Sequence, residues 1–114
     1  MGRPSREQRL KPRAFQILLI LEDGEQLGWN IVKALQAQTP GERILPGSLY
    51  RTLNEMTERG LIEALPGEGD NARRRNLRIT PMGVEAARRE AAQLEELVGL
   101  AKSKRLFFPE GSRA

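Results

Sequence analysis

The sequence predicts a mainly α fold with a small β-hairpin, followed by one long C-terminal helix. Apolar residues recur every three or four positions in three segments, which is the helical period, and a fourth segment is apolar almost throughout. Between the third and fourth helical segments, apolar and polar residues alternate on either side of a Gly-rich stretch, which is typical of a hairpin. Aromatic residues make up only 4% of the chain, so a core of Leu, Ile, Val and Ala is expected.

Length and composition limit the classes of protein. A chain of 114 residues is expected to form one domain with a modest hydrophobic core. It contains neither Cys nor His, which excludes disulfides, most zinc sites, thiol catalysis and imidazole proton transfer. The glutamates of residues 85–96 have basic neighbours at helical pairing distances, which indicates a solvated helix surface rather than a catalytic carboxylate pair. We therefore expect no enzyme activity, no cofactor and no bound metal.

Targeting features favour the cytoplasm. The longest apolar run, Ile17–Leu21, is too short to cross a bilayer. The N-terminal residues have no apolar segment after their basic residues, as a secretory signal would. We expect a cytoplasmic protein without membrane contact.

Positive charge is concentrated at the N-terminus. Residues 1–13 hold five basic side chains against Glu7 and so account for a charge of +4, which is the net charge of the whole chain. This distribution predicts a flexible basic arm that attracts a polyanion, of which nucleic acid is the foremost candidate. The alternative is a tail that only increases solubility.

The first two helices are expected to form the scaffold. The first begins near Pro12, and residues 15–21 are apolar on nearly every side, so two of its faces should be buried. The second is expected from about Leu27 to Gln38, with Leu27, Ile31 and Leu35 as its buried stripe.

The third helix is expected to start near Pro46 and end at Gly60. Leu49, Leu53 and Met56 form its apolar stripe. Gly60 suits the left-handed position that follows a helix, where the next residue contacts the last apolar side chain of the stripe.

A hairpin should follow the third helix. Its strands are expected at residues 61–65 and 73–79, joined by a polar, Gly-rich loop. Leu77 and Ile79 point one way and Arg74, Asn76 and Arg78 the other, which is the period of a half-buried strand. A helix with a polar outer face followed by an arginine-tipped hairpin is the order found in a winged helix-turn-helix, where the helix enters the major groove of DNA.

The last helix should run from Pro81 to about Leu106, with Thr80 as its N-cap. Its apolar residues follow a 3-4-3-4-3 spacing, and Leu97 and Leu100 widen the stripe. A single helix cannot bury such a seam, so we expect it to mediate dimerisation. The seam residues are Val84, Ala87, Ala91, Leu94, Val98 and Ala101.

The predicted elements give a domain organisation. It comprises a flexible basic arm at residues 1–11, a winged helix-turn-helix domain at 12–80, a dimerisation helix at 81–108 and a loose tail at 109–114.

Candidate DNA contacts lie on the third helix, the second helix and the hairpin. An Arg side chain can pair with guanine and an Asn side chain with adenine, whereas arginines of the hairpin are suited to phosphates. The alternatives are an ordinary solvated helix face, a Tyr50 that packs on a neighbouring helix, and a charge run that keeps the hairpin soluble. The candidates are Ser48, Tyr50, Arg51, Asn54, Arg73, Arg74, Arg75 and Lys33.

Trp29 is the only tryptophan. It is a candidate contact for an aromatic effector or for the DNA backbone. The alternative is that it fills space in or near the core.

Three segments resemble the PadR family of bacterial transcriptional regulators. They are ILLILEDGEQLGWNIVKAL (17–35), LPGSLYRTLNEMTERGLIE (45–63) and ARRRNLRITPMG (72–83), and Pro-Gly-Ser-Leu-Tyr at the start of the third helix is the most specific match. The resemblance implies a homodimer with exchanged C-terminal helices, and two wings on an inverted repeat. It also implies a repressor that a small hydrophobic or aromatic effector releases.

The chain departs from the family pattern at three places. Leu27-Gly28-Trp29 replaces the usual His-Gly-Tyr, and Asn76 and Leu77 replace a pair of tyrosines in the second wing strand. The C-terminal region is one helix rather than a larger domain. The tyrosine replacement affects the expected packing of the wing rather than its charge.

The sequence therefore predicts a sequence-specific, DNA-binding transcription regulator that binds double-stranded DNA as a homodimer, most simply as a repressor. Two alternatives remain open. One is a winged helix that contacts an acidic protein partner, and the other is a basic protein that binds nucleic acid without sequence preference.

Overall fold

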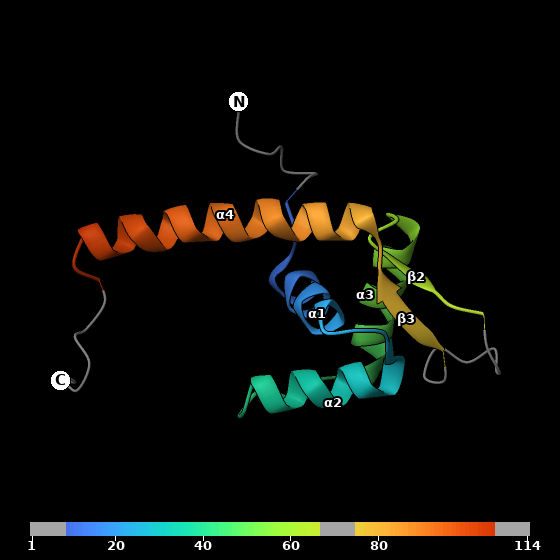
Figure 1. The fold of residues 1–114 in the computed structure, drawn as a ribbon. Coiled ribbons are helices and arrows are strands. Elements are labelled where there is room, and N and C mark those ends of the chain that lie inside the picture. Colours follow the sequence, from blue (N-terminus) through green and yellow to red (C-terminus); the bar gives the residue numbers. More distant parts are fainter. Residues whose placement is uncertain (1–8, 67–74, 107–114) are drawn as a thin grey trace.

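The computed structural model describes residues 9–66 and 75–106, and it confirms the predicted fold class. The elements follow in the order α1 (Pro12–Glu22), β1 (Gln26–Leu27), α2 (Gly28–Gln38), α3 (Pro46–Glu58), β2 (Ile62–Ala64), β3 (Asn76–Ile79) and α4 (Pro81–Ser103). Figure 1 shows α4 lying across α1, while the sheet stands at one end of the helices and α4 extends beyond the other.

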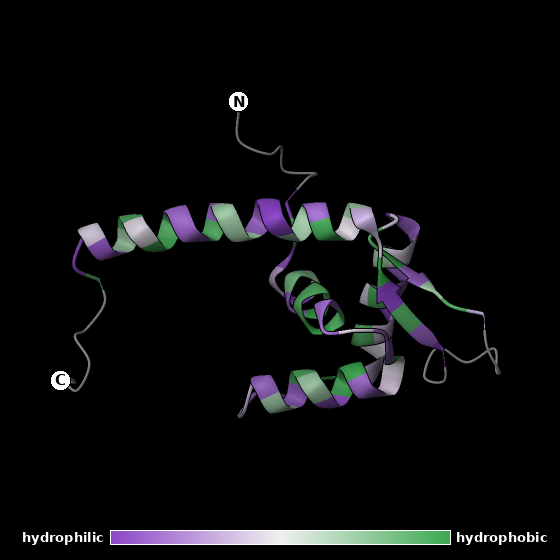
Figure 2. Cartoon of the chain, in the orientation of Figure 1, coloured by the Kyte–Doolittle hydropathy of each residue, from purple (hydrophilic) through white to green (hydrophobic). Residues whose placement is uncertain are grey.

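Helix α1 is the centre of the core. Ile17 and Leu18 are fully buried and Leu21 nearly so, and α1 packs against α2, α3, α4 and β3. Figure 2 shows α1 as mostly hydrophobic along its length. The prediction that two faces of this helix are buried is confirmed, and within residues 15–21 only Leu19 is exposed, with 47% of its surface in solvent.

The sheet has three antiparallel strands in the order β1-β3-β2, one more than the predicted hairpin. Strand β1 pairs Leu27 with Asn76, so α2 begins at Gly28 rather than at Leu27. The expectation that Leu27 belongs to the buried stripe of α2 is wrong, because a strand residue at this edge keeps 36% of its surface exposed. Ile31 and Leu35 are fully buried as predicted.

Gly60 ends α3 in the predicted way. Its φ of 76° lies in the left-handed region, which Gly adopts without steric cost. The Leu61 N–H donates to the Met56 carbonyl at 3.0 Å, and the Gly60 N–H donates to the Thr57 carbonyl at 3.0 Å. These two bonds satisfy carbonyls that the end of a helix leaves without partners, and they turn the chain sharply into β2.

Thr80 joins the end of α3 to the start of α4. Its hydroxyl accepts a hydrogen bond from the Gly83 N–H at 3.0 Å, which is the predicted N-cap. The same hydroxyl donates to the Gly60 carbonyl. One side chain thus ties the end of α3 to the start of α4, although the wing separates them in the sequence.

Gly83 allows α4 to approach the chain segment that follows α3. A Cβ atom at this position would lie 2.1 Å from the Leu61 carbonyl oxygen and 2.8 Å from Ile79 Cγ1. Neither distance is compatible with a side chain, so the close approach of α4 requires glycine.

An ion pair with a buried carboxylate fixes α4 to the chain segment before α1. The Arg9 guanidinium donates two hydrogen bonds to the Glu90 carboxylate, at 2.9 and 2.7 Å, and the Leu10 N–H donates a third at 3.1 Å. Glu90 is 5% exposed and Leu10 is 6% exposed. The end of the flexible arm predicted at residues 1–11 is therefore anchored, at Arg9 and Leu10. Local sequence patterns could not reveal this contact, because Glu90 lies 80 residues away from Leu10 in the sequence.

Helix α4 ends at Ser103, before the predicted limit near Leu106. Arg105 adopts a left-handed φ of 59°, and the Leu106 N–H donates to the Ala101 carbonyl at 3.1 Å, which closes the helix. Among the described residues, no helix combines the length and the apolar character that a membrane span requires.

Replacing Gly83 with Ala should destabilise the fold by about 3 kcal/mol, because the new methyl group would displace backbone rather than a flexible side chain. The measurement is urea unfolding followed by circular dichroism. Gly99→Ala is the matched control: nothing lies within 4 Å of its Cβ position. That change should raise stability by about 0.5–1 kcal/mol through helix propensity. Equal stability of the two variants would contradict the close contact.

Glu90 should make stability depend on acid pH. The hydrogen bonds and charge of Arg9, and the Leu10 N–H, lower the pKa of Glu90 against the opposing effect of burial. Because the folded-state pKa is depressed, this stabilisation is present above the ordinary glutamate pKa and is lost as pH falls through the folded-state value. Glu90→Gln should therefore lower stability near neutrality and lose less of it on acidification.

The measurement is the urea midpoint between about pH 6 and pH 3. Glu85→Gln, on the same helix but in an exposed pair with Arg88 at 3.9 Å, is the control. It should retain the acid sensitivity of the wild type. The same pH dependence in Glu90→Gln and wild type would refute this role of Glu90.

Candidate nucleic-acid interface

The two sides of α3 differ sharply in exposure. Leu49, Leu53 and Met56 are 2–3% exposed and face the core, as the sequence predicts. Ser48, Arg51 and Asn54 are exposed, so their side chains are accessible to a partner. Tyr50 is different: it is half-buried and packs against the core, which agrees with the alternative considered for it.

The described part of the wing separates its arginines into two kinds. Arg75 is exposed immediately before β3. Arg78 forms an ion pair with Glu63, its cross-strand neighbour in the antiparallel register. Arg73 and Arg74 lie outside the described residues. Of the three predicted wing contacts, Arg75 is therefore the one that the structure describes, and it is exposed.

Strand β1 brings the start of α2 beside the wing. The Gly28 N–H donates to the Arg75 carbonyl at 3.2 Å, and Trp29 follows directly in the chain. Trp29 is 41% exposed, and the Lys33 ammonium lies 5.9 Å from the centre of its ring, within the range of a cation–π contact. Trp29 therefore does not fill the core, and Lys33, also exposed, lies beside it.

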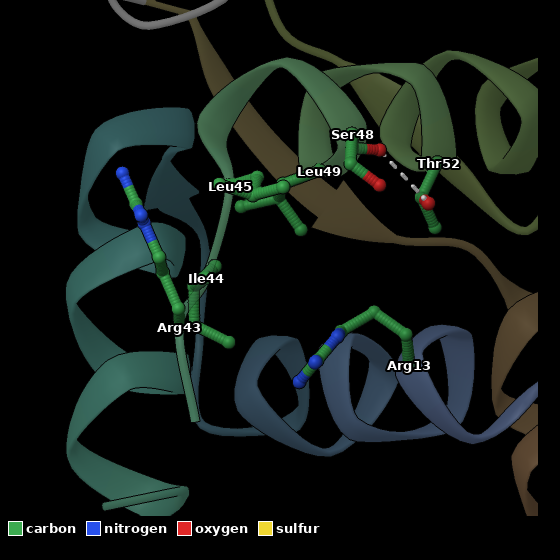
Figure 3. Close-up of a pocket in the computed structure, with 7 residues that line it drawn as sticks. All are labelled: Arg13, Arg43, Ile44, Leu45, Ser48, Leu49 and Thr52. Atoms are coloured by element: carbon green, nitrogen blue, oxygen red, sulfur yellow. Dashed lines mark hydrogen bonds between the residues drawn. The ribbon is translucent and has the colours of Figure 1, made fainter. Parts of the chain in front are cut away.

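Two further arginines lie beside α3. Arg13 of α1 and Arg43 of the α2–α3 connection line a pocket of about 110 Å³ together with Ser48 and Thr52 of α3. Figure 3 shows Ser48 and Thr52 on one side of this pocket and Arg13 on the other. No local pattern could have revealed it, because its walls come from three separate segments.

The predicted dimerisation residues fall on two parts of α4. Ala87 is 9% exposed and belongs to the core of its own chain, so packing against α1 rather than a partner buries it. Val84 and Ala101 are half-buried, and Ala91 is exposed. Leu94 and Val98 are 37% and 42% exposed, and Leu97 and Leu100 are 46% and 56% exposed. Figure 1 shows that the C-terminal part of α4 projects past the other helices.

Comparison with known proteins identifies the family. Residues 17–89, more than half of the chain, match the model of the transcriptional regulator PadR-like family. The chain belongs to this family. The matched region extends from α1 through the wing into the first half of α4, and it confirms the resemblance that the three sequence segments indicated.

Solved structures with the same fold include other PadR-like regulators. A transcriptional regulator from Clostridium thermocellum is 25% identical, with a TM-score of 0.68 over 80% of this chain and 87% of that one. A PadR-like regulator from Bacillus cereus is 24% identical, with a TM-score of 0.66 over 84% of this chain and 92% of that one. Lactococcus lactis ZitR, a zinc-responsive MarR family member, was solved in complex with DNA and shares the fold at 19% identity and a TM-score of 0.63, over 96% of this chain and 70% of that one.

A curated relative has a longer chain. It is an uncharacterized 37.1 kDa protein in transposon TN4556 of Streptomyces fradiae, 36% identical over 83 residues. The match covers 73% of this PadR-like chain and 23% of that protein. The chain therefore spans about a quarter of the length of this relative.

Proposed function

We propose that this PadR-like protein is a sequence-specific DNA-binding regulator that acts in the cytoplasm, binds an inverted-repeat operator as a homodimer and represses transcription. The observation that carries the proposal is the exposed polar face of α3, opposite a stripe that is 2–3% exposed and next to a β-hairpin. ZitR, a protein of the same fold, was solved in complex with DNA, which supports the choice of ligand. No catalytic role is proposed.

Arg51 and Asn54 are proposed to read bases. Both are exposed on α3, and their side chains offer the paired hydrogen-bonding groups that recognise guanine and adenine in the major groove. Ser48, near the start of α3, is proposed to donate to a base edge or a phosphate. Half-buried Tyr50 packs against the core and its hydroxyl oxygen is buried, so we assign it to supporting α3 from behind rather than to a direct DNA contact.

Lys33 and the wing arginines, Arg73, Arg74 and Arg75, are proposed to contact phosphates. Phosphate contacts set the position of a protein on DNA but carry no sequence information. They make affinity fall with salt, because each neutralised phosphate releases counterions. The hydrogen bond between Gly28 and Arg75 supports a shared surface for the start of α2 and the wing.

The exposed apolar residues at the C-terminal end of α4 are proposed to bind a second copy of the chain. Residues 81–108, which include α4, would then form the dimerisation segment, and residues 12–80 the DNA-binding domain. Leu94, Leu97, Val98 and Leu100 leave 37–56% of their surfaces in solvent, which favours burial against a matching helix. The proposed seam keeps Ala91, Leu94, Val98 and Ala101, while Ala87 and half-buried Val84 serve packing within the chain.

Trp29 is the proposed contact for a small hydrophobic or aromatic effector. It is 41% exposed at the start of α2, close to the proposed phosphate contact Lys33. An aromatic molecule stacked on this ring would compete with the Lys33 ammonium for the same face and so weaken a DNA contact.

The test is a selection of genomic DNA fragments by the purified protein at about 150 mM salt. Enrichment of an inverted repeat, with half-sites about 34–36 Å apart, would support a dimeric, sequence-specific regulator. Binding without enrichment would favour a nucleic-acid binder that lacks sequence preference. No binding at all would favour the protein-interaction alternative.

Arg51→Ala combined with Asn54→Ala should abolish the preference for the selected operator and retain weak binding to any DNA, because the base-reading groups are removed while the phosphate-binding groups remain. Fluorescence anisotropy with operator and scrambled duplexes measures both affinities. Arg89→Ala, an exposed arginine of α4, is the control and should retain the preference. An operator preference unchanged in the double variant would refute the assignment of α3.

Leu94→Asp should dissociate the dimer, because each subunit would bury an unpaired carboxylate in the seam. Analytical ultracentrifugation measures the assembly, and circular dichroism shows whether the helices remain. Arg88→Asp introduces the same carboxylate at another exposed position of α4 and should leave the dimer intact. A dimer that persists in Leu94→Asp would show that the seam lies elsewhere.

A further inference from the structure

A pocket flanks the first two turns of α3, on the side that faces α1. Its volume is about 110 Å³, and its walls come from α1, the α2–α3 connection and α3. Arg13, Ser48 and Thr52 provide polar groups, and Ile44, Leu45 and Leu49 provide an apolar wall. Arg43 lines the edge of the pocket, and Figure 3 shows its guanidinium directed away from Arg13. This combination of cationic, hydroxyl and apolar groups distinguishes it from an ordinary surface hollow.

The positive charge of the pocket is only partly compensated. Arg13 is held loosely, with its guanidinium 3.5 Å from the Glu42 carboxylate and 2.9 Å from the Gln16 side-chain oxygen. Glu42 is itself 59% exposed, so this pair is weak and readily exchanged for another anion. Within residues 9–66 and 75–106, exposed Arg43 forms no ion pair. The two positive charges of Arg13 and Arg43 are therefore balanced only by the single carboxylate of Glu42.

The hydroxyl groups have different roles. The Thr52 hydroxyl donates to the Ser48 carbonyl at 3.2 Å, so its proton is used within α3. The Ser48 hydroxyl is on the exposed side of the helix and is suited to donate to an anion. Leu45, 53% exposed, adds an apolar surface beside these donors. Anionic oxygens next to an apolar ring face are the chemistry of a sugar–phosphate chain.

We propose that Arg13, Arg43 and Ser48 bind the sugar–phosphate backbone of DNA alongside the groove that α3 enters. The inference rests on the proposed function, since it requires α3 to approach DNA. Arg43 and Arg13 supply forked donors that match phosphate oxygens, Leu45 packs against deoxyribose, and Ser48 joins this contact to the base-reading face one turn before Arg51. The pair between Arg13 and Glu42 opens when phosphate replaces the carboxylate.

The experiment compares the affinity of Arg43→Ala and wild type for the selected operator and for a scrambled duplex over a series of salt concentrations. Arg43→Ala should weaken binding to both duplexes about tenfold, because a phosphate contact does not distinguish sequences. The magnitude of the salt slope should decrease by about 0.9 for each phosphate that the variant no longer neutralises. Arg43→Lys, which keeps the charge, should restore the slope and part of the affinity.

Arg88→Ala removes the same charge from an exposed position on α4, and it should leave the salt slope unchanged. Glu42→Gln should strengthen binding to both duplexes several-fold, because Arg13 no longer has a competing carboxylate. A slope in Arg43→Ala equal to that in Arg88→Ala would overturn the site while the wild type still binds its operator. Failure of the wild type to bind either duplex would overturn the proposed function and this site together.

Discussion

The burial of α1 determines where the three other helices and the central strand β3 lie. A helix whose side chains at 17, 18 and 21 are at most 2% exposed needs apolar neighbours on several sides, and α2, α3, α4 and β3 supply them. Each neighbour can then turn only one face toward the core. For α3 this leaves a polar face for solvent or a ligand, and for α4 it leaves the C-terminal end outside the domain (Figure 1).

The features that the sequence predicts well are those that depend on residues close to one another in the chain. The stripe of Leu49, Leu53 and Met56 defines the inner face of α3 from spacing alone. Gly60 and Thr80 identify the end of one helix and the start of another, because the hydrogen bonds that cap each helix reach only a few residues. The matched segments of the PadR-like family include these same positions.

The features that the sequence does not predict depend on distant partners. Strand β1 is two residues long and exists because β3, about fifty positions later, pairs with it. From the sequence, Glu90 is expected to be a surface residue of a charged helix, and only the hydrogen bonds from Arg9 and Leu10 show that it is buried. Ala87 fits a dimer seam by spacing but is taken up by the core, and the pocket of Arg13 and Arg43 forms only when three segments meet.

Thr80 gives the molecule a mechanical property. Its hydroxyl donates to the Gly60 carbonyl at the end of α3 and accepts from the Gly83 N–H in the first turn of α4, so the end of one helix is tied directly to the start of the other. Gly83 lies so close to the Leu61 backbone that α4 has little room to change its angle relative to α3. In a dimer joined through α4, the separation of the two α3 helices would therefore be fixed. Operators whose half-sites have a different spacing would then bind weakly whatever their base sequence.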